Sequence, residues 1–391
     1  MDNYKINYKL SNSYPTIYPE ILIKTIDSFQ KIKKYKLITK VSDYQKINIA
    51  KDKIDYYYHK NKWDNIKKIT NPFEYIYITN KKIRNNSISN YEPLSRSYFK
   101  MIEMCHEFIP NLIHKKESIK TLHLAEGPGG FIEGIVNMRH NKNDQIYGMT
   151  LISNNKEIPG WNRAKYFLKN NPKVKILLGV DYKGDLYNPS NHIHCQTKLE
   201  TGADLITADG GFDFSVDYNL QEFLVYKLIY SQVICAIGSQ KINGHFICKF
   251  FDIYSLLTCE IIYLCYMFYE QVYIFKPHTS RPANSEKYLI CKNFKGIDNK
   301  YLRELRNILK IWNTCDDHNI ICSIFKEIPN FFKEQINNII IEIQKEQINC
   351  INKTIKLIEN PMNHIEYDTN YKQQIKNAEN WCNKYQITTK N

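Results

Sequence analysis

The stretch LAEGPGGF, residues 124–131, decides the fold, because it follows a strand-like run, TLHLAE, and opens a helix-like one, FIEGIVNMR. Gly127, Gly129 and Gly130 let the backbone approach a ligand closely, Pro128 stiffens the turn, and the helix N-terminus offers free N–H groups. The spacing fits neither a dinucleotide-binding finger, G-x-G-x-x-G, nor a P-loop, which needs a Lys-Ser/Thr pair. Taken alone, the loop is equally well explained as a plain tight turn.

Outward from this loop, residues 91–298 alternate strand-like and helix-like segments. This pattern predicts a Rossmann-like α/β sheet, mostly parallel, with helices on both faces. The expected strands include QIYGMTL, VKILLGV, DLITADGG and GHFICKFF, and residues 219–239 have helical periodicity. The segments QVYIFKP and EKYLICKNF, separated by HTSRPANS, read as a closing antiparallel pair. We therefore expect one antiparallel edge strand.

The flanking segments are less informative. Residues 1–90 show no clear period and read as an N-terminal extension of unknown role, whereas residues 299–391 carry charged amphipathic patterns and predict a helical region. The most apolar stretch, residues 256–275, is interrupted by Glu260 and Glu270. It is too polar for a membrane span and predicts a buried helix followed by a strand.

The composition predicts a soluble intracellular protein. The 391 residues are 43% hydrophobic, which supports a sizeable core, and 54 Lys and Arg against 40 Asp and Glu give a net charge of +14. Such a charge suits a polyanion, although AT-rich coding sequence explains the same excess of Lys, Asn, Ile and Tyr. The 11 cysteines form no CxxC pair and no zinc-like cluster, so we expect free thiols in a reducing compartment and no metal site. The N-terminus carries no apolar signal segment.

Two charged residues lie where chemistry is expected. Asp209 ends an apolar run and precedes two glycines, at the edge where an open α/β sheet presents its ligand-binding groups. Lys249 lies inside the apolar run HFICKFF, where a lysine is unfavourable unless it is paired or deprotonated. Lys100 and Glu286 are ambiguous alone: an exposed helix face explains the first, and a surface glutamate the second. Asp185, in GDLYNP, could accept a hydrogen bond from an adenine amino group or be an ordinary turn aspartate.

From about residue 91 to 298, the chain resembles the FtsJ/RrmJ-type ribose 2′-O-methyltransferases. The resemblance is strongest to the eukaryotic and large-DNA-virus enzymes that methylate the first transcribed nucleotide of capped mRNA. The segments that carry it are SRSYFKM, GPGGF, YGMTL, GDLYNP, ADGGF, NLQE, NGHFICKFFD and KPHTSRPANSEKYLICK. It covers just over half of the chain and says nothing of residues 1–90 or 299–391.

The resemblance implies a role for particular residues. The family's Lys-Asp-Lys-Glu tetrad falls on Lys100, Asp209, Lys249 and Glu286, with Lys249 as the general base. The methyl donor, S-adenosylmethionine, is implied to contact Ser95, Gly127, Pro128, Gly129, Gly130, Phe131, Asp185 and Asp209. The substrate side is implied to include Asn219 and Asn284, and Arg96 and Arg281 are candidate phosphate contacts. Two places depart from the family's pattern. Close relatives often carry Asn where this chain has Ser95, and AEGPGG stands in place of the usual residues before the loop.

This assignment makes three chemical expectations. Lys100 beside Lys249 should disfavour a second positive charge and so lower the pKa of Lys249. A side chain at Gly129 or Gly130 should occupy the ligand's space. Basic residues should bind RNA phosphates while aromatic side chains stack on bases, with Tyr254 as a candidate near the cap and a core tyrosine as the equal alternative.

The expected function is S-adenosylmethionine-dependent methylation of the mRNA cap at the first transcribed ribose 2′-oxygen. One alternative is the same reaction on rRNA or tRNA, and another is a catalytically silent RNA-binding subunit of the same fold. The expected partner is the capped mRNA 5′ end, other capping enzymes are candidates, and no membrane is expected. Composition and resemblance together suggest a large DNA virus, which would place the protein in the host cytoplasm or the virion.

Overall fold

A computed structural model gives the fold. It describes residues 7–10, 19–21, 30–31, 36–58, 62–155, 158–211, 221–315, 320–321 and 323–390.

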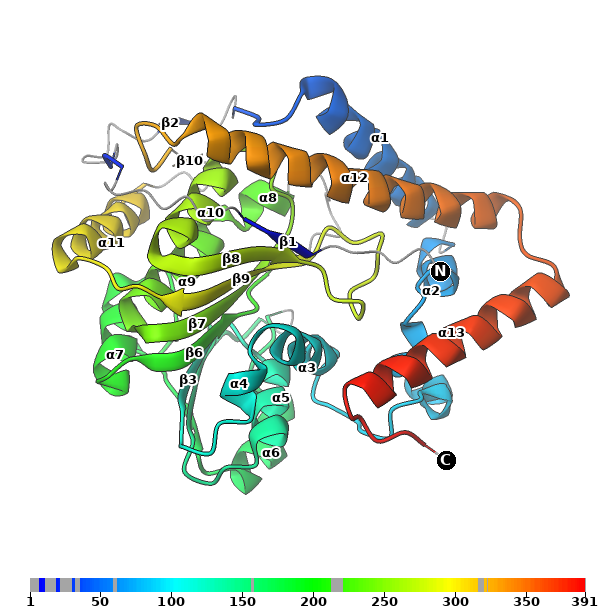
Figure 1. Cartoon of the computed structure of the whole chain (residues 1–391), viewed down its shortest axis with the longest axis horizontal. Helices are drawn as coiled ribbons and strands as arrows, with labels where there is room; N and C mark the ends of the chain where they lie inside the picture. The colour runs from blue at the N-terminus through cyan, green and yellow to red at the C-terminus, as the bar shows by residue number, and fades with distance from the viewer. Residues whose placement is uncertain are drawn as a thin grey trace.

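An eight-stranded sheet forms the centre of the described part of the chain (Figure 1). From one edge to the other, the strands are β1 (Asn7–Lys9), β8 (Tyr269–Phe275), β9 (Lys287–Phe294), β7 (Gln240–Phe250), β6 (Ala203–Ala208), β3 (Lys120–Leu124), β4 (Gln145–Met149) and β5 (Val174–Ile176). The strands from β7 to β5 are parallel to one another, which confirms the predicted Rossmann-like α/β class.

The antiparallel pair β8–β9 is also as predicted, but its place in the sheet differs from the expected one. β9 is antiparallel to both β7 and β8, so it lies inside the sheet, and the edge is formed by β1, which pairs with β8. A strand from the N-terminal extension therefore belongs to the sheet.

Helices cover both faces of the sheet. One layer contains α3 (Ser97–Phe108), α4 (Pro110–Ile113), α5 (Gly130–Arg139) and α6 (Lys165–Asn170), and the other contains α7 (Pro189–Leu199), α9 (Tyr226–Ser239), α10 (Leu256–Phe268) and α11 (Asn299–Asn313). Successive strand residues point to opposite faces. Leu205 and Ile247 accordingly pack in the core beneath the first layer, whereas Ile206, Phe246 and Cys248 pack beneath the second. Strands buried on both faces explain the continuous apolar runs of the sequence.

Local capping fixes where several helices begin. The side chain of Asn188 accepts a hydrogen bond from the backbone of α7, and Ser255 and Asp298 do the same for α10 and α11. Each satisfies a backbone N–H that has no partner within its helix. The predicted helix and strand over residues 256–275 are α10 and β8. No helix in the described ranges combines the length and apolar character that a bilayer crossing requires.

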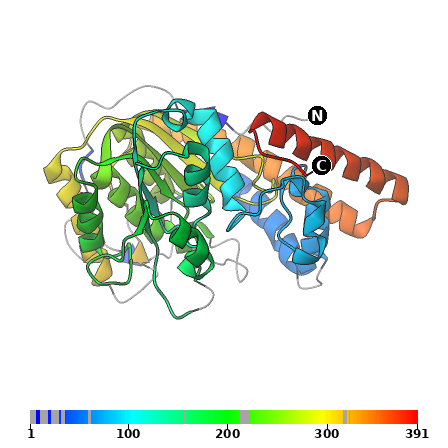
Figure 2. The same cartoon turned by 90° about the horizontal axis from the view of Figure 1, so that it is seen from below.

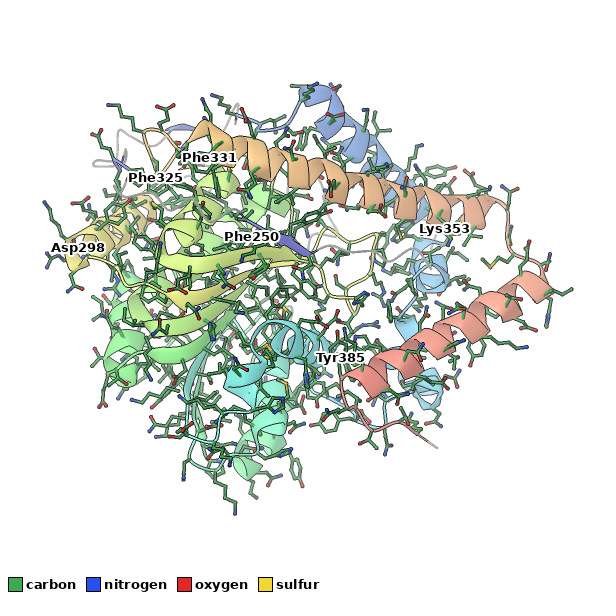
Figure 3. The ribbon with its side chains drawn as sticks, in the orientation of Figure 1. Phe250, Asp298, Phe325, Phe331, Lys353 and Tyr385 are labelled. Atoms are coloured by element: carbon green, nitrogen blue, oxygen red, sulfur yellow. The ribbon has the colours of Figure 1, made fainter. Side chains whose placement is uncertain are left out.

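The two ends of the chain pack together beside the sheet (Figure 2). The elements are α1 (Val41–Tyr58), α2 (Trp63–Ile69), the short helices η2 (Glu74–Ile76) and η3 (Lys81–Asn86), α12 (Asn330–Glu359) and α13 (His364–Lys384). α1 and α2 lie against α12, and α13 lies against η2. Phe332 of α12 packs on Tyr263 and Tyr266 of α10, with ring centroids 4.9 and 5.0 Å apart. Figure 3 shows Tyr385, just after α13, on the side of α3, where its hydroxyl binds Glu107.

Candidate active site

A cleft of about 960 Å³ opens at the edge of the sheet where the parallel strands end. Much of its lining comes from the segments that follow β3, β4, β6 and β7, and from the segment that precedes β9. Because β9 runs antiparallel to its neighbours, it begins at the edge where they end. This is the edge at which open α/β sheets bind ligands.

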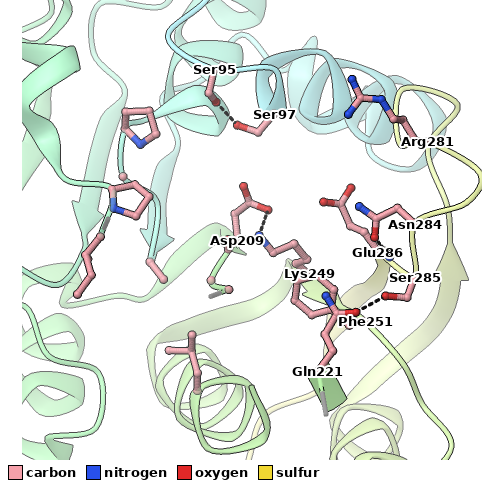
Figure 4. A pocket seen from close by; sticks show the side chains of 18 of the residues that line it. Ser95, Ser97, Asp209, Gln221, Lys249, Phe251, Arg281, Asn284, Ser285 and Glu286 are labelled. Atoms are coloured by element: carbon pink, nitrogen blue, oxygen red, sulfur yellow. Dashed lines mark hydrogen bonds and ion pairs between the residues drawn. The ribbon is translucent and has the colours of Figure 1, made fainter. Parts of the chain in front are cut away.

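Strand register brings three of the four predicted catalytic residues together. The pairing of β6 with β7 places Asp209, the first residue after β6, beside Lys249. The pairing of β9 with β7 places Glu286, just before β9, next to the end of β7. Figure 4 shows the side chains of Asp209, Lys249 and Glu286 facing one space. Lys100 reaches the same place from α3.

The four residues form two ion pairs. The ammonium of Lys249 lies 3.2 Å from a carboxylate oxygen of Asp209, and it donates a hydrogen bond of 2.5 Å to the backbone carbonyl of the same residue. The ammonium of Lys100 lies 2.6 Å from a carboxylate oxygen of Glu286. All four side chains are less than a fifth exposed. The structure therefore assembles the predicted tetrad, as two carboxylates that each hold one lysine.

The electrostatics of Lys249 differ from the prediction. Burial alone would lower the pKa of Lys249, but the charges of Asp209 and Glu286 outweigh it, and the pKa is raised. The expected lowering by Lys100 is wrong for this state, because Lys100 is already neutralised by Glu286. Burial would likewise raise the pKa of Glu286, but Lys100 and Lys249 lower it to about 2. The site at rest thus holds a protonated Lys249.

Two further side chains, those of Tyr288 and Glu126, lie near Asp209. The hydroxyl of Tyr288 donates a hydrogen bond of 3.1 Å to its carboxylate. Glu126 is fully buried, and one of its oxygens accepts a 2.6 Å hydrogen bond from the backbone N–H of Phe131, at the start of α5. Burial, and then the charge of Asp209, raise the pKa of Glu126 well above its usual range. Through this hydrogen bond, Glu126 ties the glycine-rich loop to the first turn of α5.

The glycine-rich loop needs its glycines for backbone reasons. Gly129 has a φ of +108°, in the left-handed region that side chains disfavour. A Cβ on Gly130 would lie 2.2 Å from the hydroxyl oxygens of Ser95 and Ser97, which are 2.5 Å from each other. The structure thus gives a backbone reason for glycine at position 129 and a packing reason, against the start of α3, at position 130. The expectation that side chains here would occupy the ligand's space stays a prediction.

Gly129→Val should weaken donor binding without unfolding the protein. A β-branched residue at this φ is strained by about 1–3 kcal/mol, so the loop is expected to relax away from the shape that the ligand needs. Calorimetric titration with S-adenosylmethionine should show the loss of affinity. Gly160→Ala is the matched control, because Gly160 has extended backbone and nothing within 4 Å of a Cβ. Unchanged affinity in Gly129→Val would remove the loop from the donor site.

The other predicted donor residues divide into two groups. Those that line the cleft are Ser95, Gly127, Pro128, Asp185 and Asp209. One oxygen of Asp185 accepts a hydrogen bond from the backbone of Tyr187, so this residue also makes the turn that was its alternative reading. Phe131 is fully buried and packs on Tyr288, so it supports the loop from the core. Thr150, Leu151, Ile158 and Pro159 also line the cleft and were not predicted.

The predicted substrate residues are less uniform. Arg281 and Asn284 line the cleft, and Asn219 lies outside the described residues. Arg281 makes two hydrogen bonds, of 2.9 and 3.1 Å, to Glu74, and Arg96 lies 3.5 Å from the same carboxylate. Both arginines thus have a protein partner, and their phosphate contacts stay predictions. Tyr254 is a core residue, 4% exposed, beside Tyr44.

A whole wall of the cleft was missed by the sequence reasoning. It consists of Lys51, Ile54, Trp63, Lys67 and Thr70 from the N-terminal segment, and of Gln347 and Cys350 from α12. None of these residues lies in a motif, and only the packing of the two chain ends brings them to the cleft.

Comparison with known proteins gives a family match over the same region. The model of the FtsJ-like methyltransferases matches residues 93–294. A relative from Mus musculus, named cap-specific mRNA (nucleoside-2′-O-)-methyltransferase 1, is 33% identical over 222 residues. Its counterpart from Homo sapiens is 32% identical over 222 residues. Each alignment covers 53% of this chain and 26% of the relative, so the chain spans about a quarter of the length of these relatives.

Among solved structures, a ribosomal RNA methyltransferase from Plasmodium falciparum is similar at 19% identity. The match covers 52% of this chain and 99% of that one, with a TM-score of 0.38.

Proposed function

The chain belongs to the FtsJ-like methyltransferase family, and we propose that it methylates the ribose 2′-oxygen of the first transcribed nucleotide of capped mRNA. Members of this family take the methyl group from S-adenosylmethionine. The observation that carries the proposal is the pairing of Lys249 with Asp209 and of Lys100 with Glu286. Asp209, Lys249 and Glu286 line one cleft, and Lys100 reaches it through Glu286. The names of the relatives favour a cap as the substrate over other RNAs.

The donor side of the cleft suits an adenosyl ligand. Ser95, Gly127 and Asp185 line it and would hold the ligand, since a hydroxyl, an exposed backbone and a carboxylate can bind its polar groups. When bound, S-adenosylmethionine supplies a methyl group on a sulfonium that needs no further activation. Asp209 lies between this side and Lys249, so its carboxylate would also favour a positive charge placed there.

We assign Lys249 as the general base. In its neutral form it would take the proton of the ribose 2′-hydroxyl as that oxygen bonds to the methyl carbon. Asp209 would hold the amine in place while the carbon–sulfur bond of the donor breaks and leaves a neutral thioether. The resting enzyme has a protonated Lys249, so the base must first lose that proton. A further positive charge beside it would lower its pKa. Burial, and then the nearby Lys287 and Lys100, lower the pKa of Lys276 in this way to about 7.

The substrate side combines the catalytic unit with both chain ends. We propose that residues 91–298 form the methyltransferase unit and that residues 1–90 and 299–391 complete its RNA cleft. The lining by Trp63, Lys67 and Gln347 supports this, because an aromatic ring and a cation suit a nucleotide.

Capped RNA should be methylated faster than the same RNA with a 5′-triphosphate. Stacking on one base contributes about 1–3 kcal/mol, which corresponds to a preference of about 5-fold to 150-fold. The assay uses radiolabelled S-adenosylmethionine with capped, N7-methylated and triphosphate RNAs of one sequence, and maps the labelled nucleotide. Equal rates on capped and triphosphate RNA would refute the cap assignment but keep the methyltransferase. Label in internal RNA positions would favour the rRNA or tRNA alternative, and no label would favour a silent subunit.

A further inference from the structure

Glu103 has a fully buried side chain and lies one helical turn after Lys100 on α3. Its first carboxylate oxygen accepts hydrogen bonds from the backbone N–H and the Nδ1 of His278, at 2.8 and 2.7 Å. Its second accepts from the backbone N–H and the hydroxyl of Thr279, at 3.3 and 3.2 Å, and from the indole N–H of Trp381, at 3.2 Å. A buried carboxylate is unfavourable unless it is satisfied in this way.

The residues that Glu103 holds belong to the loop of residues 276–286, which joins β8 to β9. This loop carries Glu286, the partner of Lys100. Lys276 joins the start of this loop to its end, because its side-chain nitrogen donates hydrogen bonds of 2.6 and 2.7 Å to the backbone carbonyls of Asn284 and Glu286. Fixing residues 278 and 279 therefore also fixes the end of the loop that carries Glu286.

The third contact of Glu103 comes from the C-terminal helix α13. Trp381 packs on Phe99 of α3, with ring centroids 5.9 Å apart, and on Tyr385, at 4.7 Å. Ile76 and Tyr77 belong to the same buried cluster. α13 lies outside the family match over residues 93–294, so that match does not cover the contact made by Trp381.

We propose that Glu103 is a positioning residue, which with Trp381 of α13 holds the loop of residues 276–286 so that Glu286 meets Lys100. The proposal deepens the proposed function and rests on the tetrad assigned there. Glu103 is not among the cleft-lining residues, so it acts only through the loop. The contact also affects His278: burial lowers its pKa, but its hydrogen bond to Glu103 outweighs burial and raises it.

The catalytic consequence follows from where the two residues lie. α3 carries both Lys100 and Glu103, and Glu103 binds the loop that carries Glu286. One helix therefore sets the positions of both Lys100 and Glu286 in their 2.6 Å ion pair. A displacement of about 1 Å at a reacting group can cost about 100-fold in rate. Loss of the hydrogen bonds between Glu103 and the loop should therefore lower kcat. The affinity for S-adenosylmethionine should not change, because other segments build the donor side.

The test compares Glu103→Gln, Trp381→Phe and Tyr385→Phe. Glutamine keeps the size of Glu103 but loses its charge and offers N–H groups where the site already has donors. Phenylalanine at position 381 keeps the ring packing and removes one donor to Glu103. Tyr385→Phe is the matched control, because it removes a 2.6 Å donor to Glu107, a different carboxylate of the same helix.

Each variant is measured by kcat on capped RNA, by calorimetry with S-adenosylmethionine, and by hydrogen exchange of residues 276–286. Glu103→Gln should lower kcat by about 10-fold to 100-fold, speed exchange in the loop and leave donor affinity unchanged. Trp381→Phe should do the same to a smaller degree, and Tyr385→Phe should match the wild type in all three.

Wild-type kcat and loop exchange in Glu103→Gln would overturn the inference, as would equal losses in Trp381→Phe and Tyr385→Phe. If Glu103→Gln does not fold, Trp381→Phe decides between the same outcomes. A wild-type protein that transfers no methyl group would refute the proposed function instead, and hydrogen exchange would still report whether Glu103 holds the loop.

Discussion

Lys249→Ala should lower the rate of methyl transfer by about 10²–10⁴-fold, because it removes the only group proposed to accept the proton of the 2′-hydroxyl. Donor affinity should be nearly unchanged, since the glycine-rich loop and Asp185 lie in other segments. Single-turnover assays with labelled S-adenosylmethionine measure the rate, and calorimetry measures the affinity. The rates are compared at saturating S-adenosylmethionine, so that they report the chemical step and not donor binding.

The same strand offers the control. Lys241 lies near the start of β7, is half exposed and forms an ion pair of 3.2 Å with Asp204. Lys241→Ala removes the same charge and side chain from β7 and should keep the wild-type rate. If a folded Lys249→Ala protein turned over near normally, Lys249 would not be the base and the tetrad assignment would fail.

The fold was predictable where local pattern decides it. The apolar runs of β3, β4, β6 and β7, and the glycine loop before α5, gave the parallel sheet and its order of elements along the chain. The place of β9 inside the sheet and the pairing of β1 with β8 were not predictable in the same way. Strand neighbours that are distant in sequence depend on tertiary packing, which periodicity does not encode.

The candidate site divides along the same line. Asp209 and Lys249 could be found because an acid at a strand end and a lysine in an apolar strand are unusual, and the resemblance added Lys100 and Glu286. Trp63 and Gln347 could not, because nothing marks them until α1, α2 and α12 pack beside the cleft. The family motifs cover only the unit that carries the tetrad.

The direction of the pKa shift of Lys249 also could not be predicted from the sequence. Two lysines near each other suggested mutual repulsion, yet the structure pairs each with its own carboxylate. An opposite charge at contact distance outweighs a like charge that is already neutralised, so the pKa of Lys249 rises. Which lysine pairs with which acid depends on side-chain geometry, whereas the sequence shows only that two lysines and two acids are present.

Glu286→Gln should abolish methyl transfer and lower the free energy of unfolding by about 3–5 kcal/mol, because it leaves Lys100, whose side chain is only 14% exposed, without a counter-charge. The pKa of Glu286 is about 2 against an ordinary 4.5. A lowered pKa contributes stability that is present above pH 4.5 and is lost as the pH falls toward 2, so the difference between wild type and variant should shrink across that range. Urea unfolding at pH 7 and at several acidic values measures it.

A double variant separates the structural role of this pair from its catalytic role. Lys100→Met removes the ammonium that Glu286→Gln leaves unpaired, so the double variant should be more stable than Glu286→Gln alone. Replacing both members of a buried pair by neutral groups is often tolerated, whereas removing one is not. Activity should stay absent, because neither replacement can hold the reacting groups. Recovered stability with recovered turnover would mean that Lys100 and Glu286 serve only the fold, and catalysis would then rest on Lys249 and Asp209 alone.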